Sequence, residues 1–340
     1  MKLKELYECL AQTSSLSPRK VADLKNAGLS VAEIARRYAR SEKHRPCQEP
    51  FVTPACSSYP SKLTHLNDPP LRVFHQGRNP GELPATIVGV VGSRKASRFG
   101  LAFARQLGEV LSRRGAGVCS GLALGIDGAV HEGVLSYLAR DPDGGPPIAV
   151  LGHGLGTIHP SSHRSLARAV ARTGTLLTEY PPGTPASRWT FPARNRIIAA
   201  LSDHLVVVEA GPKSGSLYTA EFADELGRQV WIVPTAPGRP NSEGVLKLWD
   251  SGVNPITNIE EFAERVAPTS RRDASPLILT PAKREVLRLL AQSGGSTEHL
   301  CEESELSAME LACLLSESEM EGHLRRMLDG TWEVNRVIHP

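Results

Sequence analysis

The middle of the chain alternates between two hydrophobic patterns. Short, almost continuously apolar runs alternate with longer runs in which apolar residues recur every three or four positions. The first pattern is typical of strands buried on both faces, and the second is typical of amphipathic helices. Strands are predicted over residues 85–92, 116–121, 147–152, 174–180, 204–210 and 229–234. Helices are predicted near residues 98–114, 126–139, 161–172, 192–201, 215–227 and 242–251.

This alternation predicts an α/β fold for residues 85–266. Strands that are separated by helices form a parallel sheet, because each helix returns the chain to the starting edge of the next strand. Right-handed crossovers then place helices on both faces of the sheet. We therefore expect an extended Rossmann-like domain with a doubly wound parallel sheet.

The residues before this domain divide into two parts. Residues 1–45 contain short stretches with helical spacing, including Leu6, Leu10 and Leu16, and they predict a small helical domain. Residues 46–84 are rich in Pro, Ser, His and Asn and show little periodicity. We expect them to form a linker or an irregular segment.

A second small domain is predicted after the sheet. Residues 267–276, with the sequence APTSRRDASP, predict a linker. Residues 277–340 combine three helical runs with an alternating segment around a Gly turn, which favours a winged-helix-like domain. The predicted helices cover residues 283–290, 305–315 and 318–328, and the predicted hairpin covers residues 329–337.

Length and composition agree with a folded chain of more than one domain. At roughly 150 residues per domain, 340 residues favour about two domains. The 40% of hydrophobic residues can form a core, and the six cysteines contain no C-x-x-C pair, which argues against a disulfide scaffold or a zinc ribbon. No apolar run has the length of a membrane span, and the first residues lack a signal-peptide pattern. We expect a cytoplasmic protein.

The net charge of +3 is distributed unevenly. Residues 1–85 carry 13 Lys and Arg against 8 Asp and Glu, and residues 271–340 carry 8 against 12. Nucleic-acid binding requires local positive charge, because phosphate neutralisation supplies most of the affinity. The acidic end of the chain is therefore a poor candidate for the main nucleic-acid surface, and any anion site in the middle must come from clustered residues.

Four loops are candidates for such a cluster. In an open α/β sheet, ligands bind beyond the carboxyl ends of the strands, and these loops follow predicted strands with Ser hydroxyls, basic side chains and Gly turns that suit phosphate. Each loop alone is also compatible with a capped turn or a solvated helix face, whereas four on one edge favour a shared site. The candidate residues are Gly92, Ser93, Arg94, Ser97, Ser120, Gly121, Phe191, Arg194, Asn195, Arg196, Lys213, Ser214, Gly215 and Ser216.

Aromatic residues in the third loop refine the expected ligand. Trp189 and Phe191 stand beside the basic residues and could stack on nucleobases. Basic residues next to aromatic residues suit single-stranded nucleic acid better than an isolated phosphate. In the second loop, Asp127 would repel phosphate, so we expect its carboxylate to orient the loop.

Other kinds of chemistry have weaker support. Residues 152–156 follow a strand, but Thr157 stands where the G-x-G-x-x-G motif of dinucleotide sites has its third Gly. His159 and His163 lie four residues apart without an H-E-x-x-H motif, and no G-x-S-x-G motif is present. We therefore expect no cofactor, no metal ion and no serine nucleophile.

One catalytic alternative stays open at this point. Glu209 ends a predicted strand and Glu221 lies in the following predicted helix, so they could act as a general acid and base. A nucleotide phosphoribohydrolase of the Rossmann type would use such a pair. The same two carboxylates are equally compatible with a helix cap and a surface charge.

Four segments together resemble the DprA/Smf family of DNA-processing proteins. They are Gly92-Ser93-Arg94, SGLALGID (120–127), FPARNRIIAALS (191–202) and VVVEAGPKSGSLYTAEFA (206–223). The resemblance implies a non-enzymatic protein that binds and protects incoming single-stranded DNA and helps to load RecA recombinase during natural transformation. It also implies a homodimer formed through the Rossmann-like domain, with a single-stranded-DNA-binding protein as a further partner.

The resemblance also assigns roles to individual residues. Ser93 and Arg94 would contact phosphates, and the residues Arg194, Asn195 and Arg196 would line the same basic pocket. Lys213, Ser214, Gly215 and Ser216 would complete that pocket, and Phe191 would pack beside a base. Two segments depart from the family pattern, namely His159-Pro160-Ser161-Ser162-His163 and residues 235–255.

Overall fold

The computed structural model divides the chain into two units, Met1–Arg272 and Asp273–Pro340, which are described separately. The described residues are 29–30, 33–34, 50–268, 286, 289–290, 297–304, 306–320, 324–326 and 331–334. The small helical domain predicted for residues 1–45 lies almost entirely outside the described residues, and so does the linker predicted for residues 267–276.

Nine strands within residues 50–268 form one sheet in the order β1-β2-β6-β5-β4-β3-β7-β8-β9. All neighbouring pairs among the strands β3 to β9 are parallel. All six predicted strands belong to this part, so the Rossmann-like doubly wound sheet is confirmed. The bounds are β1 Phe51–Val52, β2 Val73–Gly77, β3 Ile87–Val91, β4 Gly117–Ser120, β5 Pro147–Val150, β6 Thr175–Thr178, β7 His204–Val207, β8 Gln229–Ile232 and β9 Asn254–Pro255.

The segment 46–84 differs from the expected linker. It contributes β1, β2 and the short 3-10 helices η1 (Ser61–His65) and η2 (Pro80–Glu82). Strand β2 pairs antiparallel with β6 and makes the whole sheet mixed. Because β1 has two residues and two of the five residues of β2 are exposed, neither strand produces a recognisable run of apolar residues.

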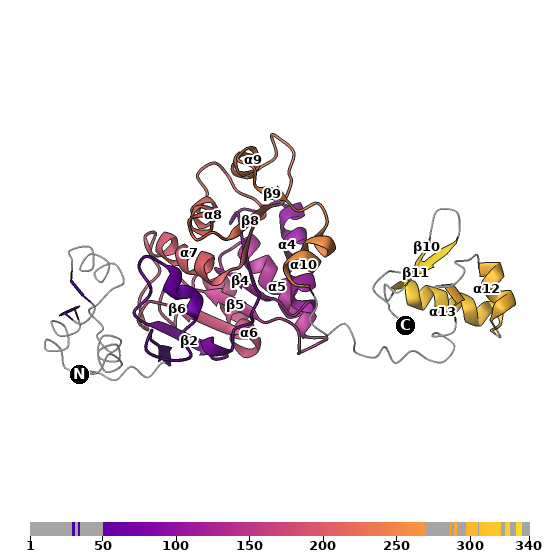
Figure 1. Cartoon of the computed structure of the whole chain (residues 1–340), viewed down its shortest axis with the longest axis horizontal. Helices are drawn as coiled ribbons and strands as arrows, with labels where there is room; N and C mark the ends of the chain where they lie inside the picture. The colour runs from indigo at the N-terminus through magenta and orange to yellow at the C-terminus, as the bar shows by residue number, and fades with distance from the viewer. Residues whose placement is uncertain are drawn as a thin grey trace. The chain divides into compact units, whose positions relative to one another are not determined.

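Helices cover both faces of the sheet (Figure 1). Side chains of β3 alternate, so Val88 and Val90 join one core cluster and Ile87 and Val91 join the other. The first face carries α4 (Arg98–Arg113), α5 (Ile126–Leu138) and α10 (Ile259–Val266), and the second carries α7 (Thr190–Leu201), α8 (Gly215–Glu225) and α9 (Glu243–Asp250). The helix α6 (Arg164–Thr173), preceded by η3 (Ser161–His163), packs with β2, β5 and β6.

The strand order reverses at β3. The chain builds outward from β3 through β4 and β5 to β6, and then returns to form β7 on the other side of β3. Loops that follow strands on the two sides of such a switch point diverge, which leaves room for a ligand beyond the carboxyl ends of the strands. The predicted anion loops lie at this edge, since they follow β3, β4 and β7 or begin α7.

The C-terminal unit contains α12 (Thr297–Glu303), α13 (Ala308–Met320) and a hairpin of β10 (Leu324–Arg326) and β11 (Trp332–Val334). Its core includes Val286, Leu311, Leu324 and Trp332. The helix predicted over residues 318–328 is wrong in its second half, because Leu324 starts the hairpin and pairs with Val334. Gly322 weakens any helix there. The winged-helix assignment stays a prediction.

Candidate functional site

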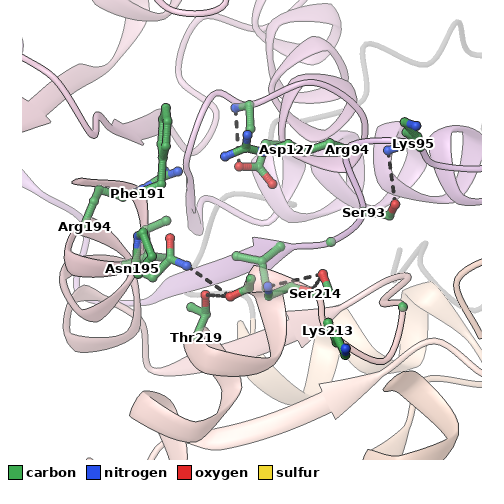
Figure 2. A pocket seen from close by; sticks show the side chains of 18 of the residues that line it. Ser93, Arg94, Lys95, Asp127, Phe191, Arg194, Asn195, Lys213, Ser214 and Thr219 are labelled. Atoms are coloured by element: carbon green, nitrogen blue, oxygen red, sulfur yellow. Dashed lines mark hydrogen bonds between the residues drawn. The ribbon is translucent and has the colours of Figure 1, made fainter. Parts of the chain in front are cut away.

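A cavity of about 890 Å³ opens at the carboxyl edge of the sheet beside the switch point (Figure 2). The loop after β3, the loop after β4, the first turns of α7 and the loop before α8 converge on it, as the sequence predicted for the four anion loops. Ten of the candidate residues line it: Gly92, Ser93, Arg94, Phe191, Arg194, Asn195, Lys213, Ser214, Gly215 and Ser216.

The cavity wall is strongly basic. Its lining residues include five with cationic side chains and one carboxylate, that of Asp127. The cations are Arg94, Lys95, Arg188, Arg194 and Lys213. All of them except Arg194 are exposed, so a polyanion can reach them from solvent. This composition attracts phosphate groups.

Arg94 and Phe191 form a layered contact inside the cavity. The Arg94 Cζ atom lies 4.7 Å from the centroid of the Phe191 ring, and the His159 ring packs against Phe191 at 5.8 Å between centroids. A guanidinium that covers an aromatic ring still presents its outer face. Planar guanidinium groups stack on nucleobases, so this pair can hold an unpaired base and place a positive charge beside its phosphate.

Arg194 forms the floor of the cavity and is 3% exposed. Its Nη1 donates a hydrogen bond to the Val150 carbonyl over 2.8 Å. Burial lowers the pKa of Arg194, and the nearby Asp127 carboxylate opposes that shift. A Cβ at Gly121 would lie 1.6 Å from Nη1, so Gly121 is required to make room for this guanidinium. Arg194 therefore supplies a fixed charge beneath the cavity.

Asp127 orients the second loop, as its acidic character predicted. Its Oδ2 accepts hydrogen bonds from the backbone N–H groups of Gly121 over 3.1 Å and Ala123 over 3.4 Å. Between them, Leu122 adopts φ 56°, a conformation that non-Gly residues rarely hold without support. Burial raises the pKa of Asp127, while Arg194 and the two backbone donors act in the opposite direction.

The N-terminus of α8 forms a second polar wall. Ser214 is the N-cap residue, and its Oγ accepts a hydrogen bond from the Ser216 N–H and pairs with the Ser216 Oγ at 2.7 Å. Asn195 Nδ2 donates to the Gly215 carbonyl over 3.1 Å and thereby joins α7 to α8. N–H groups in the first turn of a helix have no intrahelical partner and favour anions. Figure 2 shows Asn195, Ser214 and Thr219 around this corner.

Two predicted serines have structural contacts instead of facing the cavity. Ser97 caps α4 by accepting from the Gly100 N–H, and both its N–H and its hydroxyl bond to the Glu209 carboxylate. The protein's own carboxylate therefore occupies the N-terminus of α4, where the sequence predicted an incoming anion. Ser120 is fully buried and donates to the Val90 carbonyl. Gly121 lines a small adjoining recess of about 40 Å³.

Arg196 also lies outside the cavity lining, although it is two residues from Arg194. Its guanidinium is buried and pairs with Glu179 Oε2 at 2.6 Å and with Asp68 Oδ2 at 3.3 Å. The predicted contribution of Arg196 to the basic pocket is thus corrected. On a helix, positions that are two residues apart face different directions, so both arginines could not enter one cavity.

Sequence reasoning missed several polar residues of the lining, among them Arg188, Lys95 and Asn241. Arg188 and Lys95 stand beside candidates that the motifs identified, and their charge alone could have suggested them. Asn241 comes from the segment that departs from the family pattern. Its Nδ2 donates to the Lys95 carbonyl over 2.8 Å, and its φ of 60° is the left-handed conformation that Asn tolerates best among non-Gly residues.

The carboxylates of the catalytic alternative do not line the cavity. Glu209 is buried against Ser97, and Glu221 is exposed on α8. Among the described residues, no group of three or more His, Cys, Asp or Glu side chains is placed to hold a metal ion. None of the described helices is long and apolar enough to span a membrane.

A family model described as DNA recombination-mediator protein A matches residues 50–267 of the chain. Protein Smf of Synechocystis is 34% identical over 267 residues, which cover 75% of this chain and 65% of the relative. Protein Smf of Escherichia coli is 41% identical over 209 residues, covering 61% and 54% respectively. The chain therefore spans between about half and two thirds of these two relatives.

Solved structures give the same result. The X-ray structure of DNA processing protein A from Streptococcus pneumoniae superposes with a TM-score of 0.65 and 28% identity, covering 78% of this chain and 99% of that one. DNA processing protein A from Helicobacter pylori, whose structure describes a single-stranded DNA binding mode, superposes with a TM-score of 0.57 and 25% identity. That match covers 64% of this chain and 96% of the Helicobacter pylori chain.

Proposed function

The chain belongs to the DNA recombination-mediator protein A family, and on that premise we propose that it binds single-stranded DNA in the cavity at the carboxyl edge of the sheet. The observation that carries this proposal is the convergence of five cationic side chains on a cavity that also contains a stacked guanidinium and aromatic ring. Charge provides affinity for the backbone, and the stacked pair provides a surface for bases.

The arrangement assigns different tasks to different residues. Arg94 and Lys213 would neutralise phosphates from opposite sides of the cavity, and the Ser214 and Ser216 hydroxyls at the positive end of α8 would hold a phosphate oxygen. The outer face of the Arg94 guanidinium would stack on a base. Because the faces of bases in a duplex are already stacked, this contact favours an unpaired strand.

We take the more specific biological role from the resemblance of the chain to its family. We propose that the protein protects incoming single-stranded DNA and helps to load RecA recombinase during natural transformation, acting in the cytoplasm as a homodimer. We also propose that it is not an enzyme, since Glu209 and Glu221 do not line the cavity. Release of a free base from AMP or CMP, abolished by Glu221→Gln, would instead favour the phosphoribohydrolase alternative.

The DNA-binding site is tested by fluorescence anisotropy with labelled oligo-dT and a duplex of equal length. Wild type is expected to prefer the single strand, with affinity that falls as salt rises. Arg94→Ala and Lys213→Ala should weaken binding to all sequences alike, and each should reduce the salt slope by about 0.7, the value for one phosphate of a single strand.

Arg172→Ala provides the matched control. Arg172 is an exposed residue of α6 and does not line the cavity, so its removal changes the net charge by the same amount. Its binding curve should overlay that of wild type. Equal losses in all three variants would show that net charge, and not the cavity, determines affinity, and the site would be rejected.

A further inference from the structure

Trp189 lies immediately outside the cavity and is 65% exposed. It precedes α7 as the N-cap residue, and its neighbours Ala186, Ser187, Arg188 and Phe191 all line the cavity, whereas Trp189 does not. An exposed indole offers a large, rigid aromatic face on which a nucleobase can stack. Its position at the cavity mouth makes it continuous with the proposed DNA site.

The turn that carries Trp189 is well ordered by hydrogen bonds. The Trp189 N–H donates to Ser187 Oγ over 3.3 Å, and the Thr190 hydroxyl donates to the Ser187 carbonyl over 2.9 Å. The Ser187 N–H donates in turn to the Thr190 hydroxyl over 3.1 Å. The indole is therefore presented from a closed turn at the start of a helix, which reduces the entropy lost when a ligand binds.

Arg188 prepares the same ring for an anionic ligand. Its Cζ atom lies 4.6 Å from the centroid of the Trp189 ring, so the guanidinium covers one face. The indole nevertheless remains mostly exposed, which leaves its other face open to solvent. This arrangement repeats the contact of Arg94 with Phe191 inside the cavity, again pairing a guanidinium with an aromatic ring.

Resting on the function proposed above, we propose that Trp189 is a second base-stacking platform, which holds a nucleobase of the strand next to the part that occupies the cavity. Arg188, beside both the ring and the cavity, neutralises the phosphate that connects the two. A free nucleotide would meet only one platform, whereas a strand long enough to span both would bind more tightly. The occupant is thus a nucleobase of the same single strand.

The experiment measures dissociation constants for oligo-dT of about 3 and about 12 nucleotides, lengths chosen to lie below and within known site sizes for single-stranded DNA. Trp189→Ala should weaken binding of the longer strand at least about fivefold, which corresponds to the lower limit for one base stacked on an aromatic ring. It should leave the shorter strand within about twofold of wild type, because the cavity residues are unchanged. Trp189→Phe should restore most of the affinity.

Trp249→Ala is the matched control, since Trp249 is also exposed, at 44%, but lies on α9 and does not line the cavity. It should bind both strands like wild type. Indole fluorescence provides a second readout: the longer strand should quench emission in Trp249→Phe but not in Trp189→Phe.

The possible outcomes separate the two proposals. If wild type binds neither strand, the proposed function fails and this inference fails with it. If wild type binds but Trp189→Ala behaves like wild type with both strands, the platform is rejected and the DNA-binding function stands. Equal losses for Trp189→Ala and Trp249→Ala would also reject the platform, because they would indicate a general loss of exposed aromatic surface.

Discussion

At the scale of single residues, the FPARNR motif shows what sequence can and cannot determine. The motif identified Phe191, Arg194 and Asn195 as neighbours of a basic site, and all three line the cavity. It could not distinguish Arg194 from Arg196, because the partner of Arg196 is Glu179, which lies at the end of a strand 17 residues earlier. A buried ion pair between distant residues leaves no local pattern.

Arg196→Ala is expected to destabilise the fold rather than the DNA complex. Removal of the Arg196 guanidinium leaves the Glu179 carboxylate, which is 3% exposed, without the cation with which it pairs. Breaking such a buried pair costs about 3–5 kcal/mol. Urea unfolding at pH 7 measures this free energy. DNA affinity, measured under conditions where the variant is folded, should stay close to that of wild type.

The same variant should show a distinctive pH dependence. Burial already raises the pKa of Glu179 above its ordinary value of 4.5, and Arg196 opposes that rise, so removing Arg196 raises the pKa further. The folded state of the variant then binds a proton more tightly than the unfolded state, and its stability falls as pH rises above about 4.5. The loss in free energy of unfolding relative to wild type should therefore become smaller toward acidic pH. Addition of Glu179→Gln to Arg196→Ala should reduce this pH dependence. A loss of stability that is the same at every pH would show that the Glu179 carboxylate is not its cause.

At the scale of elements, the cavity depends on two loops that fit closely together. Gly125 adopts φ 78°, and a Cβ there would lie 2.2 Å from the Ser93 carbonyl oxygen. The Ile126 N–H donates to that same oxygen over 3.3 Å. The sequence predicted both loops from their glycines. It could not show that one loop fixes the position of the other, because the contact joins loops that follow different strands, β3 and β4.

Gly125→Ala is therefore expected to affect both stability and DNA binding. The substitution combines the cost of an alanine held at φ 78° and ψ −127°, about 1–3 kcal/mol, with a clash that displaces Ser93 and Arg94. Gly115→Ala is the control, because Gly115 has φ 77° and a Cβ there would meet no atom of the described residues within 4 Å. Thermal unfolding should show a lower melting temperature for both variants. Fluorescence anisotropy should show weaker oligo-dT binding for Gly125→Ala alone. Similar oligo-dT affinities for the two variants would indicate that the Gly125 turn does not fix the position of Arg94.

At the scale of the whole molecule, the sequence predicted the parallel part of the sheet and missed its first edge. Parallel strands are buried on both faces, so β3 to β8 appear as apolar runs. Strand β2 gains its place only by pairing with β6, about a hundred residues later, and no local pattern records that pairing. The sequence did not predict the switch point at β3, because the switch point depends on the order of the strands in the sheet. Topological rules limit that order but do not determine it uniquely.

Removal of residues 273–340 is expected to leave DNA binding intact. These residues form a separate unit with its own core, and they carry more acidic than basic side chains. The remaining chain should bind oligo-dT within about twofold of the full chain, because charge neutralisation depends on nearby cations. The stimulation of RecA filament formation that we propose for the full chain should be reduced in the truncated protein. A large loss of DNA affinity would place a binding surface in the C-terminal unit.

The carboxylate at the start of α4 has a consequence for the direction from which DNA is attracted. Glu209 places a carboxylate against the Ser97 cap at the start of α4, whereas the start of α8 is capped by the neutral Ser214 hydroxyl and lies beside Lys213. The electric field at the cavity is therefore asymmetric, with its attractive side toward α8. A sugar–phosphate chain entering the cavity would run along that side and turn its bases toward Arg94 and Phe191.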